Sequence, residues 1–155
     1  MRVITDEWTG LLAELQAKVS LAGRQRLLQN CIESLEQITR SNFGPDGENR
    51  PQEWPDLSEN YAAEWHDGDT TPTLKLDDER HELRNPGEPH LVDSFENTVA
   101  ENSAELTNVS SYADVHQMGY GAKRRPYYPI TDAGELLPAA KISLAAILEK
   151  HFTAG

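Results

Sequence analysis

FENTVAENSAELTNVS, residues 95–110, is the stretch in which apolar and polar side chains come closest to alternating. Period-two spacing is typical of a half-buried strand, so we expect two strands around a turn near Asn102–Ser103. Glutamate and asparagine interrupt the pattern and lower its β-propensity, so the strands should be short. The alternating positions are Phe95, Asn97, Val99, Leu106, Asn108 and Ser110.

Helical periodicity lies on the N-terminal side of this stretch. Thr5, followed by Asp6 and Glu7, is typical of a helix start, with a hydroxyl cap and carboxylates in the first turn. Two amphipathic patterns follow with Gly23 between them, so we expect helices at 6–20 and 24–41. One bent helix is the alternative, because glycine inside a helix costs only about 1 kcal/mol. The apolar positions are Trp8, Leu11, Leu12, Leu15, Val19, Leu27, Leu28, Cys31, Ile32, Leu35 and Ile38.

The chain between these helices and the strands is rich in turn residues and carboxylates. Residues 43–47, Phe-Gly-Pro-Asp-Gly, have turn chemistry. Ser58 is placed to cap a short helix that continues through Tyr61 and Trp65. We interpret residues 66–90 as a long acidic loop, with room for short helical turns near 74–83.

The C-terminal part of the chain returns to helical spacing. Tyr112–Met118 indicates a single helical turn ended by glycine, and Tyr127–Ile130 indicates an edge strand, because proline removes a ladder donor. The final helix is expected at 133–152, with an apolar face of Leu136, Leu137, Ala140, Ile142, Leu144, Ile147, Leu148 and Phe152.

These patterns together predict an α+β fold in one domain of residues 1–155. N-terminal helices, a small mostly antiparallel sheet and a C-terminal helix packed on the sheet are the expected parts. The long acidic loop at 66–90 would interrupt them.

Charge is unevenly distributed along the chain. The net charge is −12, and residues 46–105 hold 17 acidic against 4 basic side chains, so the remainder is close to neutral. An acidic middle argues against general nucleic-acid binding, because phosphate contacts need lysine and arginine, and against binding to an anionic membrane surface. We therefore expect no sequence-specific nucleic-acid binding either. No apolar run reaches the ~18 residues that span a bilayer. The single Cys31 and an N-terminus without a signal region favour production in a reducing cytoplasm.

Catalytic and metal-binding patterns are weak. The five histidines are scattered and show no recognised ligand spacing, so we expect no metal. Cys31 lies on an apolar helix face, which favours a buried, inert thiol. Gly119-Tyr120-Gly121 lacks the strand before it and the helix after it that a dinucleotide loop requires, so we expect no cofactor and no enzymatic activity.

The candidate interaction residues lie mainly in the C-terminal half. Lys123, Arg124 and Arg125 form the one cationic cluster of an acidic chain, and they could dock on the acidic 66–90 loop of a neighbouring copy or form a solvated turn. Tyr112 and His116 could make a subunit contact, or fix the turn that presents Tyr120 and Lys123; the plainer interpretation is a satisfied, half-buried histidine. Aromatic side chains that flank loops can anchor a partner or pack in the core, and here they are Trp54 and Trp65.

Four short blocks of the chain together resemble a known family. They contain Phe43 and Gly47 with Trp-Pro-Asp-Leu-Ser at 54–58; Leu83 and Gly87 with Leu-Val-Asp-Ser-Phe at 91–95; Tyr112–Gly119; and Arg-Arg-Pro-Tyr-Tyr-Pro-Ile at 124–130. In this order they are similar to the virion morphogenesis or tail completion proteins of Mu-like and related tailed phages. The family often has an aromatic residue where this chain has Met118, and a threonine where it has Pro86.

The resemblance implies a structural role in the virion. Such a protein would be made in the host cytoplasm and would complete the tail or join head and tail as a homo-oligomeric, hexameric ring. Its partners would be the tail tube or tail terminator and the head connector. A tail terminator, a capsid-assembly factor and an acidic binding module unrelated to phage remain the alternatives.

Overall fold

The computed structural model describes residues 20–44, 47, 49–65, 67–70, 89–120 and 123–153, and for Trp65 only the backbone. The fold is α+β, as the sequence predicts. Its elements are α2 (Leu21–Ser41), α3 (Glu59–Trp65), the 3-10 helix η2 (Leu91–Asp93), β1 (Phe95–Val99), β2 (Ala104–Asn108), α5 (Ala113–Met118) and α6 (Pro138–Thr153). The expected helix at 6–20 and most of the expected loop at 66–90 lie outside the described residues.

The contacts divide the chain into two compact units. Unit 1 takes residues up to Ile38, Glu96–Thr107 and Pro129 onward, and unit 2 takes Thr39–Phe95 and Asn108–Tyr128. Helix α2 and the hairpin each continue along the chain from one unit into the other. No helix within the described ranges is long and apolar enough to cross a membrane.

Helix α2 begins earlier than predicted, and Gly23 does not break it. The Ser20 hydroxyl accepts a hydrogen bond from Gly23 N at 3.2 Å, and the Ser20 carbonyl accepts one from Arg24 N at 2.9 Å. This is a serine N-cap bonded to the third helical N–H. Gly23 therefore lies in the first turn of α2, where it is buried.

The two strands form an antiparallel hairpin, as predicted. Ala100 N donates to Ser103 O, and Val109 N donates to Ser94 O, each at 2.8 Å. This register pairs Thr98 with Glu105. The second strand begins at Ala104, directly after the predicted turn at Asn102–Ser103.

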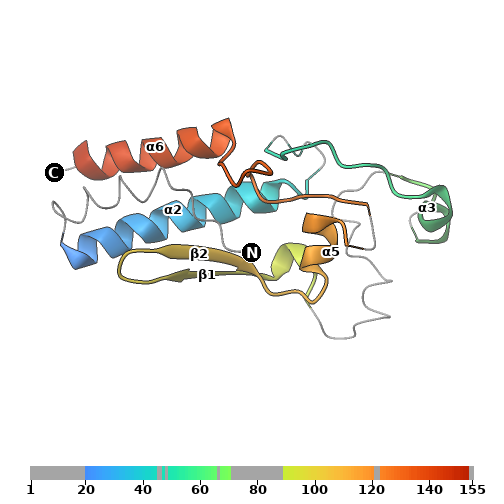
Figure 1. Cartoon of the computed structure of the whole chain (residues 1–155), viewed down its shortest axis with the longest axis horizontal. Helices are drawn as coiled ribbons and strands as arrows, with labels where there is room; N and C mark the ends of the chain where they lie inside the picture. The colour runs from blue at the N-terminus through green and yellow to red at the C-terminus, as the bar shows by residue number, and fades with distance from the viewer. Residues whose placement is uncertain are drawn as a thin grey trace. The chain divides into compact units, whose positions relative to one another are not determined.

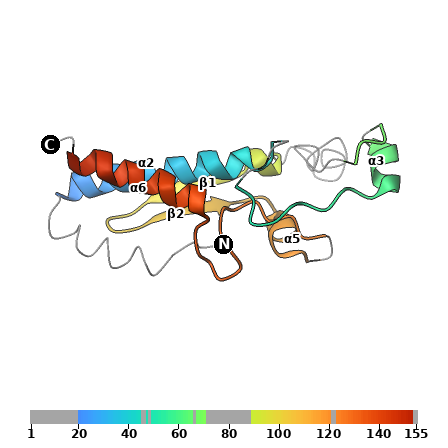
Figure 2. The same cartoon turned by 90° about the horizontal axis from the view of Figure 1, so that it is seen from above.

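Unit 1 packs the hairpin and α6 against α2. Asn97 joins β1 to α2, since its amide nitrogen lies 2.6 Å from a Glu36 carboxylate oxygen and its amide oxygen lies 3.4 Å from Gln29 Nε2. The hydroxyls of Ser34 and Ser143 lie 2.8 Å apart, which joins α2 to α6. The two helices run side by side in opposite directions (Figures 1 and 2). Buried side chains of this unit are Leu27, Leu28, Ile32, Leu106, Ile130, Leu136, Ala140 and Leu144.

The predicted edge strand at Tyr127–Ile130 is not formed. In this segment only Ile130 makes a bridge, to Leu136. Pro126 and Pro129 have no N–H to offer a ladder, and the N–H groups of Tyr127 and Tyr128 point to a side chain of unit 2 instead.

The last helix begins five residues later than predicted. Thr131 N donates to Glu135 O at 2.7 Å, and Gly134 adopts a φ of 81°, so residues 131–135 form a turn. Pro138 then takes the first helical position, which suits a residue without an N–H and with a fixed φ.

The buried face of α6 also differs from the predicted face. Ala140 and Leu144 are buried, and Ile147 and Leu148 are half-buried. Ile142 and Phe152, which were placed on that face, are 70% and 46% exposed. Their spacing turns them away from the arc of α6 that meets α2.

Candidate interaction surface around helix α5

Unit 2 collects most of the residues proposed for interaction. Trp54, Tyr112, His116, Tyr120, Lys123, Arg124 and Arg125 all belong to it. The side chain of Trp65 lies outside the described residues.

An aromatic cluster forms the centre of unit 2. The Phe43 ring lies 5.5 Å from that of Trp54, 5.4 Å from that of Tyr127 and 6.2 Å from that of Phe95, measured between ring centroids. The rings of Tyr127 and Tyr128 lie 4.8 Å apart and are tilted by 44°. These separations suit favourable aromatic pairs, and the five rings are nearly or fully buried. Trp54 is thus a core residue, whose indole N–H donates to the Pro126 carbonyl at 2.8 Å.

Gln117 connects α5 to the segment that follows it. Its side-chain oxygen accepts the backbone N–H of Tyr127 at 3.0 Å and that of Tyr128 at 3.4 Å, and the residue is 3% exposed. The tyrosine pair therefore satisfies its N–H groups on α5 and not on a strand. Sequence reasoning missed this role, and the only signal was a polar residue in a predicted helical turn.

Arg125 points inward, toward the Trp54–Leu57 segment. Its guanidinium donates to the carbonyls of Pro55 and Asp56, both at 3.0 Å, and its backbone N–H donates to the His116 carbonyl at 2.8 Å. Burial lowers the pKa of this guanidinium from its ordinary value. Lys123 is exposed, and its amine reaches the same Asp56 carbonyl at 3.2 Å. Two members of the cationic cluster, Lys123 and Arg125, therefore clamp this chain's own carbonyls at Pro55 and Asp56.

His116 stands behind this clamp. Burial, and secondarily the charge of Arg125, lower its pKa to about 4, so the imidazole is neutral at pH 7. Its ring meets that of Tyr112 edge-on at 5.9 Å. His116 Nδ1 is buried and has no hydrogen-bond partner among the described residues.

The C-terminal end of α5 reaches the surface. Gly119 ends the helix in the left-handed conformation, with a φ of 82°, and its N–H bonds to Val115 O at 3.0 Å. Arg124 Nε donates to the Gln117 carbonyl at 3.0 Å and fixes the returning chain. On either side of Gly119, Met118 is 48% and Tyr120 is 65% exposed. We call Met118, Tyr120 and Lys123 the α5 surface.

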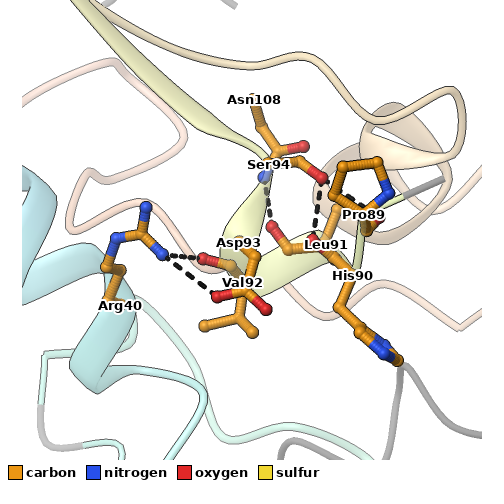
Figure 3. A network of polar contacts seen from close by, with 8 residues as sticks. All are labelled: Arg40, Pro89, His90, Leu91, Val92, Asp93, Ser94 and Asn108. Carbon is orange, nitrogen blue, oxygen red and sulfur yellow. Dashed lines mark hydrogen bonds and ion pairs between the residues drawn. The ribbon is translucent and has the colours of Figure 1, made fainter. Parts of the chain in front are cut away.

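A second polar network orders the chain before β1 (Figure 3). The Arg40 guanidinium contacts the Val92 carbonyl and lies 3.6 Å from an Asp93 carboxylate oxygen. Ser94 Oγ donates to His90 O at 2.7 Å, and Asn108 Nδ2 donates to Leu91 O at 2.7 Å. The 3-10 turn is thereby tied to both α2 and the end of β2.

Within the described part of the chain, no three histidine, cysteine, aspartate or glutamate side chains gather as a metal site. Burial raises the pKa of the Cys31 thiol to about 11, which keeps it protonated and weakly nucleophilic at neutral pH. The arrangement around α5 can hold a small surface in a fixed shape, which suits contact with a partner.

Comparison with protein-family models, with curated proteins and with solved structures gave no match to this chain.

Proposed function

We propose that this chain is a structural phage assembly protein that completes the tail or joins head and tail, acting by protein–protein contact in a hexameric homo-oligomeric ring. Its partners would be the tail tube or tail terminator and the head connector. Its place would be the virion, after synthesis in the host cytoplasm.

One observation carries the proposal: described residues from all four blocks of the resemblance meet in unit 2. Phe43, Trp54, Phe95 and Tyr127 come from three of them and form the aromatic cluster. Gln117 comes from the remaining block, Tyr112–Gly119, and its side-chain oxygen accepts the Tyr127 N–H. Blocks that are far apart in the chain thus depend on one another physically, as expected if they are the signature of one folded unit.

The form of this unit also supports a contact role. The side chains of Gln117 and Arg125 bond to backbone N–H and carbonyl groups inside the unit, while Met118, Tyr120 and Lys123 are exposed. An exposed aromatic residue on an anchored turn loses little conformational entropy when a partner covers it.

Deletion of the gene from the phage genome that encodes it tests the proposal. Electron microscopy of the lysate should show filled heads and tails that are not joined, and supply of the protein in trans should restore joined particles. Normal yields of infectious, joined virions after deletion would overturn the proposal. A Tyr120→Ala, Lys123→Ala chain should complement poorly, while Glu96→Ala, on the outer face of the hairpin, serves as the control.

A further inference from the structure

Helix α6 has an outer face that nothing in the described part of unit 1 covers. Exposed positions repeat around one side of the helix: Pro138, Ala139, Ile142, Ala145, Ala146, Glu149, Lys150, Phe152 and Thr153. Glu149 and Lys150 are the two charged side chains among them, and Lys150 lies at the edge. Ile142, at the centre of this side, is 70% exposed, and Phe152, at its edge, is 46% exposed. An apolar helix face of this kind marks a contact site, since a surface helix normally turns a polar face to water.

We propose that this face, the α6 outer face, binds the same face of a second copy of the chain. The pair would be antiparallel and related by a twofold axis, so that each copy contributes the same surface. The proposal goes beyond the role in the virion, because self-association through α6 requires no other virion protein.

Charge favours a second copy at this place. The net charge of −12 lies in residues 46–105, so copies repel one another chiefly through that segment. Helix α6 carries Lys141, Lys150 and Glu149, a small positive balance before His151 is counted. Two copies can therefore approach along α6 with less repulsion than along the acidic segment.

Shape favours an antiparallel pair about a twofold axis between Ala145 and Ala146. Small side chains at the centre let two helices approach closely. Phe152 of one copy then lies opposite Pro138 and Ala139 of the other, so a large side chain meets small ones. On the same side of the axis, Glu149 of each copy lies opposite Ile142 of the other. The methylenes of Glu149 meet Ile142.

The first test compares variants by sedimentation equilibrium. Ile142→Asp should weaken self-association by roughly 30-fold or more, the effect expected of a central interface side chain. Thr98→Asp adds the same charge at an exposed position of the hairpin and should leave the association unchanged. Equal association of wild type and Ile142→Asp would overturn the proposal. A monomeric wild-type chain, together with a lower Tm for Ile142→Asp, would also overturn the proposal, because the face would then be covered by the chain itself.

The second test uses the symmetry. The cysteine introduced by Ala146→Cys lies beside the same cysteine of a second chain only in a twofold pair. A short bis-maleimide should therefore link two chains. Glu105→Cys, on the hairpin, should give no linked pair. The native Cys31 should stay unmodified at pH 7, since the pKa of its thiol is raised to about 11, and the wild-type chain checks this. Absence of linked pairs for Ala146→Cys in a chain that does self-associate would show a different contact and reject this one.

Discussion

Side chains that point inward fix the surface of unit 2. Arg125, Gln117 and Asn42 all lie deep in the unit and bond to backbone groups of other segments: Asn42 Nδ2, for example, donates to Tyr127 O at 2.8 Å. A buried arginine or glutamine of this kind is costly to remove, because its backbone partners lose their hydrogen bonds without regaining water. Single replacements of these side chains therefore test the clamp on the Trp54–Leu57 segment.

Replacement of Arg125 should destabilise the protein, while replacement of Lys123 should not. We expect Arg125→Ala to lower the free energy of unfolding by about 2–3 kcal/mol, since two carbonyls lose a charged donor. Lys123→Ala removes an exposed contact to the same Asp56 carbonyl and should stay within about 0.5 kcal/mol of wild type. Urea unfolding measures both. Similar stabilities for the two variants would contradict the clamp.

His116 should make stability depend on pH. Its pKa is lowered from 6.5 to about 4 in the folded chain, so the unfolded chain binds a proton more readily between these values. The contribution of His116 to the free energy of unfolding is then fully present above pH 6.5 and is lost as pH falls toward 4. Below pH 4 this group causes no further change. The loss across the window should reach about 3 kcal/mol, at about 1.4 kcal/mol per pKa unit.

Urea unfolding between pH 7 and pH 4 measures this loss. His116→Gln retains a neutral side chain and should remove most of the slope in this window relative to wild type. A wild-type slope that survives in the His116→Gln variant would assign the pH dependence to other groups.

Several elements could be predicted because local signals specify them. Ser58 caps α3 through its carbonyl and hydroxyl, as its position before the helix suggests, and Gly119 ends α5 in the left-handed conformation. The hairpin follows from its alternation. In each of these elements, residues close in sequence make the hydrogen bonds at its ends.

The elements that could not be predicted depend on partners in other elements, which no local pattern specifies. Tyr127–Ile130 has the composition of a strand, but Gln117 takes the N–H groups that a neighbouring strand would have used. Leu136 continues the apolar pattern of α6, yet it pairs with Ile130 before the helix begins. Among the candidate residues, sequence reasoning favoured a half-buried His116 but did not indicate that Arg125 faces inward, since burial depends on tertiary packing.

Alanine substitutions at Gly119 and Gly134 separate the cost of a left-handed backbone from the cost of steric crowding. Gly119 and Gly134 have φ values of 82° and 81°, but an added Cβ at Gly119 would lie 3.0 Å from Arg124 Cβ, and at Gly134 it would meet nothing within 4 Å. Gly134→Ala should cost only the left-handed strain, on the order of 1 kcal/mol, and Gly119→Ala should cost clearly more. Thermal unfolding compares them. A smaller loss for Gly119→Ala would mean that the end of α5 is not the tight anchor described above.

At the scale of the whole molecule, charge and apolar surface act against each other. A net charge of −12 keeps copies apart at low ionic strength, whereas the α6 outer face and the α5 surface gain from being covered. Self-association should therefore strengthen as salt rises from low to moderate concentration. Light scattering in a salt series measures this, and association that weakens with salt would point to attraction between opposite charges, such as the cationic cluster on the acidic loop.

The central claim is that this chain works as a structural ring. Its most direct test is the mass of the full chain in solution by light scattering over a concentration series at moderate salt, with negative-stain images of the same samples. We predict a closed hexameric ring. A chain that stays monomeric at every concentration, and instead captures a basic protein, would contradict the ring and favour an acidic binding module.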